Sequence, residues 1–290
     1  MADARVALIT GGTDGIGKAV AARLVGDGWD VVLAGRDPTR CAATVSELQA
    51  GAERPVSAIV ADLSLLAETS RACDEFLATH ESLDFLFLNA NAIARTRTLT
   101  SEGFETNLAL GYLSRALMAR KLEAPLAAAG GQILSVVGLN KSPLDPNDLS
   151  MEKGFSGMKA LGRWQWAVQV HAREWNRRSP VPMNMYMPGI VKTKILDSEP
   201  NVLTRTAIKT IYAVKASSAE ASAERITGVM RDVERNRRRG AYYAVDKLKP
   251  PRDLGTGPET QEKLRALTES ILRPYLSPNA EGHSGTAPAE

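Results

Sequence analysis

The sequence predicts an α/β fold in which a doubly wound parallel sheet of the Rossmann type forms a single domain. First, short apolar runs rich in β-branched residues alternate with helical stretches of roughly 10–25 residues, the pattern of right-handed β–α–β units. Second, most of these runs are continuously apolar, as in strands covered by helices on both faces. Third, neither an internal repeat nor a linker divides the 290 residues into two cores.

The predicted elements alternate along the chain. The strands cover residues 5–10, 30–34, 56–61, 83–88, 132–137 and 181–187. The helices between them cover residues 15–26, 38–50, 64–80, 101–128 and 155–178. A helix over 218–237 and a last strand over 240–245 follow, and we assign residues 1–275 to the domain. Residues 276–290 are rich in Ser, Pro, Gly and Ala, which is typical of a disordered tail.

The composition is that of a globular protein able to bury a sizeable core, with 44% hydrophobic and 24% charged residues. Lys and Arg number 36 and Asp and Glu 33, so the net charge is +3. This charge is too small and too dispersed to favour nucleic acid as a partner. The one dense basic stretch, residues 231–239, also contains acidic residues, and we interpret it as a solvated helix face.

The two cysteines, Cys41 and Cys73, organise neither a disulfide framework nor a metal site, because their spacing fits neither. The N-terminus lacks an apolar secretory segment, and no apolar run approaches the ~18 residues that cross a membrane. We therefore expect a cytoplasmic protein without a membrane span.

A glycine-rich loop follows the first predicted strand and opens the first helix. It reads Thr-Gly-Gly-Thr-Asp-Gly-Ile-Gly over residues 10–17. Glycines in this context allow a tight turn, a close approach of the backbone to a diphosphate, and close packing of helix on strand. The start of the helix also favours negative charge. The predicted phosphate contacts are Gly11, Thr13, Gly15, Ile16 and Gly17.

Arg36 is the first charged side chain after the second predicted strand. A cofactor with a free 2′-hydroxyl usually meets a carboxylate at this place, whereas a guanidinium suits a 2′-phosphate. Arg36 therefore favours NADP(H) over NAD(H). The alternative is an ordinary surface arginine beside Asp37.

With these motifs in order, the chain resembles the short-chain dehydrogenase/reductase family over about residues 5–250. Asp62 and Leu63 resemble the pair that contacts the adenine ring. Asn89 and Ala90 resemble the end of the family's fourth-strand motif, although Asn91 follows where glycine is usual. The resemblance implies cofactor contacts from these four residues and from a segment that closes over the nicotinamide, comprising Pro188, Gly189, Val191 and Thr193.

The catalytic positions of the family are altered. Its carbonyl reduction uses a Ser at the end of the fifth strand and a Tyr and a Lys four residues apart, of which the Tyr donates the proton. Gly138 aligns with the Ser, and Ser135 lies deeper in the strand. The Tyr/Lys pair has two possible registers. One places Phe155 and Lys159 on the pair. The other, with a lead-in like that of the retinol-dehydrogenase-like branch, places Leu161 and Gln165 there.

Neither register supplies a tyrosine, so the usual proton donor, worth about 10²–10⁴ in rate, is absent. The remaining candidate catalytic residues are Lys159, Gln165, Asp145 as an acid, and Asn107, which resembles the family's structural and proton-relay asparagine. His171 lies too far along its helix to be a site residue. Trp164, Trp166 and Trp175 look exposed on the same helix and are compatible with the family's usual dimer interface.

Three functions follow from these observations. The first is an NADP(H)-dependent oxidoreductase with an atypical proton source, acting on a small apolar metabolite of a biosynthetic pathway. The second is a non-redox cyclase, isomerase or lyase on a repurposed reductase scaffold. The third is a catalytically silent NADP(H)-binding protein. Residues 194–216 are the predicted lid, and the family implies a homodimer or homotetramer.

Overall fold

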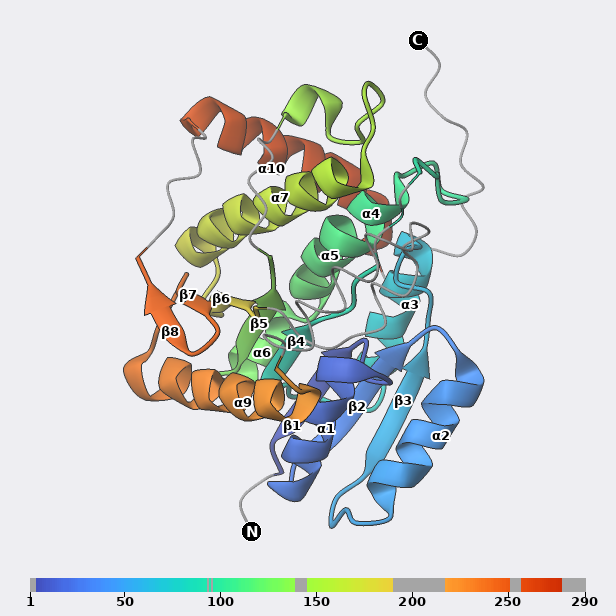
Figure 1. The fold of residues 1–290 in the computed structure, drawn as a ribbon, viewed down its shortest axis with the longest axis vertical. Helices are drawn as coiled ribbons and strands as arrows, with labels where there is room; N and C mark the ends of the chain where they lie inside the picture. The colour runs from blue at the N-terminus through green and yellow to red at the C-terminus, as the bar shows by residue number, and fades with distance from the viewer. Residues whose placement is uncertain are drawn as a thin grey trace.

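A computed structural model gives the fold and describes residues 4–92, 94, 96–138, 145–189, 217–250 and 257–277. One eight-stranded sheet runs through the molecule in the order β3-β2-β1-β4-β5-β6-β7-β8 (Figure 1). All neighbouring strands are parallel except β8, which pairs antiparallel with β7. The order reverses direction between β1 and β4, so the sheet is doubly wound and the predicted fold class is confirmed.

The strands lie close to their predicted places. They are β1 Val6–Thr10, β2 Asp30–Gly35, β3 Val56–Val60, β4 Phe85–Leu88, β5 Gln132–Val136, β6 Met183–Met187, β7 Tyr242–Ala244 and β8 Lys247–Lys249. Strands β1, β4 and β6 are buried at every position. Helices on both faces leave no side of these central strands to solvent, which explains why their sequences are continuously apolar rather than alternating.

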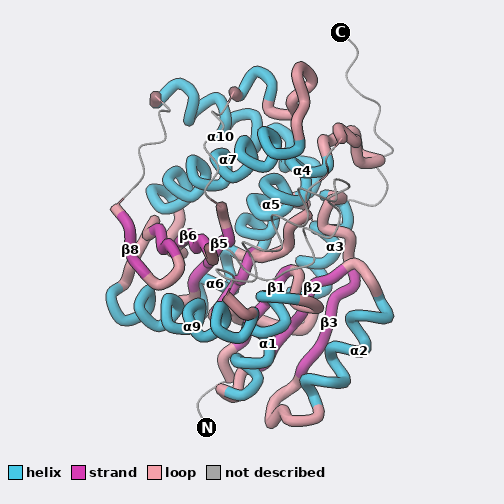
Figure 2. Tube along the Cα trace, viewed as in Figure 1, coloured by secondary structure: helices cyan, strands magenta, loops and turns pink. Residues whose placement is uncertain are grey.

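Two layers of helices cover the sheet (Figure 2). One layer contains α1 Gly15–Gly26, α2 Pro38–Gln49 and α9 Ala219–Asn236. The other contains α3 Leu66–Leu77, α5 Ser114–Lys121, α6 Glu123–Ala129, α7 Gly157–Arg178 and α10 Pro258–Leu272. Each layer packs its apolar side chains against one face of the sheet, which gives two separate core clusters.

The single helix predicted over 101–128 is wrong. Residues 101–105 are not helical, because the Glu105 carboxylate caps the following turn by accepting from the backbone N–H groups of Asn107 and Leu108. The helix then runs as α4 Thr106–Leu108, a π-helical turn over Ala109–Leu113, and α5, and it is interrupted at Leu122. Pro125 lacks the N–H that would continue the hydrogen bonds of α5 into α6.

The sequence did not predict α10, which packs along α7 (Figure 1). Leu264, Thr268 and Leu272 of α10 are buried. The Tyr112 hydroxyl on the π-helical turn lies 2.6 Å from the Thr268 hydroxyl. The carbonyl of Tyr275, just past α10, accepts a hydrogen bond of 2.8 Å from Ser70 on α3. Residues 258–275 therefore complete the core on this face of the sheet.

The three tryptophans of α7 are buried and not exposed as predicted, because they belong to the core cluster on this face of the sheet. Trp164 is 1% exposed, Trp166 8% and Trp175 5%. None of the helices in the described part of the chain combines the length and the apolar character that crossing a bilayer requires. The predicted lid, Val191 and Thr193 lie outside the described residues, as does the predicted tail from residue 278 onward.

Candidate cofactor and active site

The loop between β1 and α1 has the backbone geometry of a phosphate cradle. Gly11 has a φ of +65°, and its N–H donates to the carbonyl of Ala34 on β2 at 2.9 Å. A side chain at Gly17 would place its Cβ 2.2 Å from the Gly11 carbonyl oxygen. The helix therefore begins directly against the loop, and only glycine fits. Backbone N–H groups at the start of a helix, approached this closely, form a site for an anionic group.

Asn89 fixes this loop to the end of β4. Its backbone N–H donates to the Thr10 hydroxyl at 2.9 Å, and its side-chain amide donates to the Thr10 carbonyl at 3.1 Å. The N–H of Ala90 donates to the same hydroxyl at 3.0 Å. These bonds join β1 and β4 where the strand order reverses, which is the position at which such sheets bind ligands.

Arg36 is exposed immediately after β2. The neighbouring carboxylate of Asp37 accepts a hydrogen bond of 3.0 Å from the N–H of Arg40 and caps α2. Thr13 lies beside the end of β2, since a Cβ on Gly35 would be 3.0 Å from its methyl carbon. Arg36 therefore lies at the end of β2, the strand whose end Thr13 of the glycine-rich loop contacts.

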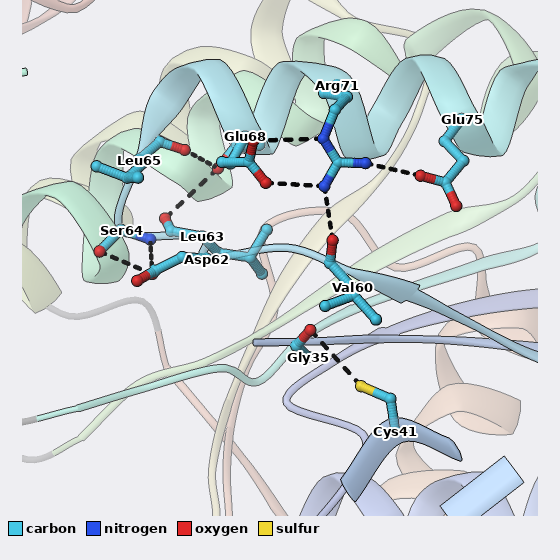
Figure 3. Close-up of polar contacts among 11 residues, drawn as sticks. Gly35, Cys41, Val60, Asp62, Leu63, Ser64, Leu65, Glu68, Arg71 and Glu75 are labelled. Carbon is cyan, nitrogen blue, oxygen red and sulfur yellow. Dashed lines mark hydrogen bonds and ion pairs between the residues drawn. The ribbon is translucent and has the colours of Figure 1, made fainter. Parts of the chain in front are cut away.

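The end of β3 forms the next part of the edge (Figure 3). The Asp62 carboxylate accepts from the N–H and the hydroxyl of Ser64, at 2.9 and 2.7 Å. Arg71 of α3 holds the strand end by donating to the Val60 carbonyl at 2.6 Å. Leu63 is buried under this turn. The Asp62 carboxylate is therefore oriented at the end of the strand, and the contact of Asp62 and Leu63 with an adenine ring stays a prediction.

At the other half of the site, side chains of α7 occupy the space beside two glycines. A Cβ on Gly138, just after β5, would lie 2.8 Å from Nε2 of Gln165. A Cβ on Gly111, in the π-helical turn, would lie 2.4 Å from Cδ2 of Trp164. Gln165 is buried, and its Oε1 has no hydrogen-bond partner in the described part of the chain. Its contact with Gly138 supports the register in which Leu161 and Gln165 replace the Tyr/Lys pair.

The other candidate catalytic side chains are exposed or occupied. Lys159 is exposed on the first turn of α7. Asp145 accepts a hydrogen bond of 3.0 Å from the N–H of Asn147 and caps a short turn. Asn107 uses its amide on the backbone of Ala94, accepting at 2.7 Å and donating at 3.1 Å. Its amide also donates to Glu105 at 2.8 Å, so Asn107 positions the loop after β4.

The buried cation Arg115 was missed in the sequence. Its guanidinium, 5% exposed, donates to the Ser135 hydroxyl at 2.8 Å, to the Val136 carbonyl at 2.5 Å and to the Ala90 carbonyl at 2.9 Å. It also lies 5.0 Å over the ring of Trp164. Desolvation lowers the pKa of Arg115 to about 9. One signal was available, since Arg115 is the only charged residue between Glu105 and Arg120.

The segment after β6 begins as predicted. Pro188 and Gly189 follow the strand directly, and Gly189 has a φ of +75°. The carbonyl of Met187 accepts a hydrogen bond of 2.8 Å from the N–H of Val245, which fixes the start of this segment to β7. A Cβ on Gly189 would lie 3.2 Å from a methyl carbon of Val245. The strand β6 therefore ends in a turn at the carboxyl edge of the sheet, and Val245 packs against that turn.

Comparison with known proteins identifies the family. The model of the family described as short chain dehydrogenase matches residues 5–202. A Streptomyces sp. (strain C5) protein named "Putative daunorubicin C-13 ketoreductase DnrU" is 33% identical over 193 residues, which cover 66% of this chain and 67% of that protein. Human retinol dehydrogenase 13 is 24% identical over 279 residues, covering 92% of this chain and 84% of that protein.

A solved structure shares the fold. An alcohol dehydrogenase from the archaeon Thermococcus sibiricus, complexed with 5-hydroxy-NADP, superposes with a TM-score of 0.64 at 21% identity. The superposition covers 86% of this chain and 99% of the archaeal chain. The doubly wound sheet, the glycine-rich loop at its edge and the match of the family model lead to one conclusion: the chain belongs to the short-chain dehydrogenase/reductase family, with relatives in its retinol-dehydrogenase-like branch.

Proposed function

We propose that the chain is an NADP(H)-dependent oxidoreductase acting on a small apolar metabolite, with a proton source other than the family's tyrosine. The observation that carries the cofactor assignment is the phosphate cradle, in which Gly17 and Gly11 leave no room for a side chain. Arg36, exposed at the end of the neighbouring strand β2, supports NADP(H) over NAD(H). The names of several relatives and solved structures, ketoreductase, retinol dehydrogenase and an alcohol dehydrogenase with an NADP derivative, agree with this proposal.

When bound, the cofactor would supply a hydride. The residues of the chain would bind the different parts of the cofactor. The cradle and Arg36 would hold the phosphates, and Asp62 and Leu63 the adenine. Pro188 and Gly189 would begin the cover over the nicotinamide. Gly138 stands at the position of the family's serine, and in either register, with Phe155 or Leu161, the tyrosine is absent. Such a site is suited to a substrate whose product needs no protonated oxygen, such as an iminium ion or a conjugated system.

One observation favours the second candidate, a non-redox enzyme on the same scaffold. Gln165 and Trp164 fill the space left by Gly138 and Gly111, so the site is rebuilt around large side chains rather than merely stripped of its acid. A cavity of changed shape can direct a cyclisation or an elimination by orienting its substrate. A cytoplasmic location and a biosynthetic role belong to the proposal in either case.

The first test is binding. We expect the purified chain to bind NADPH more tightly than NADH, measured by the change in cofactor fluorescence. Arg36→Ala should weaken NADPH binding roughly ten- to hundredfold, the effect of losing one hydrogen bond to a charged group, and leave NADH binding unchanged. Arg54→Ala is the matched control, since Arg54 is an exposed arginine before the amino end of β3. Equal loss for both cofactors would contradict the role of Arg36, and no binding by the wild type would contradict the proposal.

The second test separates the two chemistries. A panel of carbonyl, imine and enone compounds is offered to the NADPH complex, and loss of the reduced cofactor is followed by absorbance. Consumption by the imine or enone members, with the simple ketones unchanged, is the expected result. Tight NADPH binding without consumption by any member would move the non-redox candidate ahead of the oxidoreductase.

A further inference from the structure

Among the described residues, the buried positive charge of Arg115 has no counter-ion. All of its hydrogen-bond acceptors in the described part of the chain are neutral, comprising one hydroxyl and two backbone carbonyls, and its Nε–H has no partner there. Burying a charge without an opposite charge beside it costs folding free energy. Lys121 on the same helix is neutralised in the ordinary way, because its buried ammonium group pairs with the Asp74 carboxylate at 2.7 Å.

The contacts of Arg115 place it under one half of the proposed cofactor site. Ala90 lies two residues past the end of β4, and Val136 is the last residue of β5. Both carbonyls therefore lie at the carboxyl edge of the sheet, on the side of the switch point away from β2 and β3. A dinucleotide at this edge spans both sides. Arg36 and Asp62 mark the adenosine side, so Arg115 lies beneath the nicotinamide side.

The guanidinium is held rigidly in this position. Trp164 lies against its face and is itself seated on Gly111, where no side chain would fit. Ser135, fully buried in β5, accepts from the other side. The two acids nearest along the chain both have other partners: Glu123 pairs with Arg120 at 3.3 Å, and Glu105 accepts from three N–H groups of Asn107 and Leu108. Because no acid in the described part of the chain neutralises it, the charge of Arg115 acts on a ligand bound above it.

We propose that Arg115 makes the site discriminate between the two redox states of its cofactor, favouring NADPH over NADP+. The oxidised nicotinamide ring carries a positive charge and the reduced ring carries none, so a fixed positive charge below the ring repels only the oxidised form. This inference rests on the proposed function, because it requires that the chain binds NADP(H). Two unit charges about 10 Å apart in an effective dielectric constant of about 20 change an affinity by roughly tenfold.

The experiment measures the dissociation constants of NADPH and NADP+ by calorimetry for the wild type and three variants. Arg115→Met removes the charge and keeps the bulk, Arg115→Gln removes the charge and keeps hydrogen-bonding capacity, and Arg115→Lys keeps the charge. The ratio of the NADP+ to the NADPH dissociation constant should fall about tenfold in Arg115→Met and Arg115→Gln, mainly through tighter NADP+ binding. Arg115→Lys should retain most of the ratio.

Arg120→Met is the matched control, because Arg120 is an exposed cation on the same helix and pairs with Glu123 at 3.3 Å. It should leave the ratio unchanged. Should Arg115→Met not fold by circular dichroism, the ratio measured for Arg115→Gln decides the test. An unchanged ratio in the neutral variants, or an equal loss in Arg115→Lys, overturns this inference alone. Failure of the wild type to bind either form overturns the proposed function as well.

Discussion

At the scale of single residues, the unusual positions of the site come in complementary pairs. Gly138 faces the amide of Gln165, and Gly111 faces the ring of Trp164, at separations that leave no room for a Cβ. Protein interiors are close-packed, so a large side chain can enter such a space only if its neighbour is small. The loss of the family's serine at Gly138 is therefore coupled to the presence of Gln165.

This coupling predicts the effect of restoring the family's serine. Gly138→Ser alone should lower the free energy of unfolding by about 1–3 kcal/mol, because the new Cβ would overlap the Gln165 amide. Combined with Leu161→Tyr and Gln165→Lys, the serine should be tolerated better, because a lysine side chain can turn away. Urea denaturation midpoints measure both effects.

The control for this prediction is Gly228→Ser. Gly228 lies on α9, and a Cβ there would meet nothing within 4 Å. Its stability should change by no more than about 0.5 kcal/mol. A single Gly138→Ser variant as stable as the wild type would show that Gln165 moves freely, and the pairing would have no energetic basis.

His171 predicts a second effect at this scale. Its ring lies between Tyr112 and Trp175, with centroids 5.9 and 6.2 Å away. Desolvation, and secondarily Arg120, lowers the pKa of His171 to about 4. In the unfolded chain the His171 imidazole binds a proton near pH 6.5, whereas in the folded chain it stays neutral down to about pH 4. The free energy of unfolding therefore falls as the pH decreases from about 6.5 toward 4.

We expect His171→Phe to flatten this part of the pH profile. The wild type should lose on the order of 1 kcal/mol between pH 7 and pH 5 through this residue, and the variant should lose less. Denaturant midpoints at the two pH values give the difference. His80→Phe, at a half-buried position whose ring stacks on Phe76, is the comparison variant. Parallel profiles for wild type and His171→Phe would contradict a buried neutral imidazole.

At the scale of elements, local patterns predicted most of the sheet and failed where a tertiary contact decides. The strands that are buried on both faces had continuous apolar runs, and the loop of Gly11 to Gly17 stands between strand and helix as predicted. The helix over 101–128 failed because Glu105 acts as a cap and Pro125 as a break within an otherwise helical composition. The cap and the break each depend on a single residue. The hydrophobic periodicity averages over many residues, so it shows neither clearly.

Element α10 shows the other limit of the sequence. It has few apolar residues, and only Leu264, Thr268 and Leu272 are buried on it. This apolar stripe is narrow, and it is buried only because it packs against α7, which lies far away in the sequence. The geometry of the candidate site was predictable where a motif is local, as at Asn89 and the loop of Gly11 to Gly17. It was not predictable at Gly111, Trp164 and Arg115, because their roles follow from contacts between α7 and the helix after β4.

At the scale of the whole molecule, α10 occupies the face on which the family resemblance expects a second subunit. Seven consecutive residues of α7, Trp164 to Val170, are buried within the single chain. A helix covered on every side has no apolar stripe left for a partner. α10 provides the cover on the outer side, with the hydroxyls of Tyr112 and Thr268 joined at 2.6 Å.

We therefore expect the protein to be a monomer in solution. Light scattering coupled to gel filtration should give the mass of a single chain, 31.2 kDa. Leu264→Asp combined with Leu272→Asp should detach α10, cost more than about 3 kcal/mol of stability, and increase the mass by exposing the apolar face of α7. Ser270→Asp, on the exposed side of α10, should change neither property. A wild-type mass of two or four chains would instead support the family's usual assembly, and it would require an interface other than the one that α10 covers.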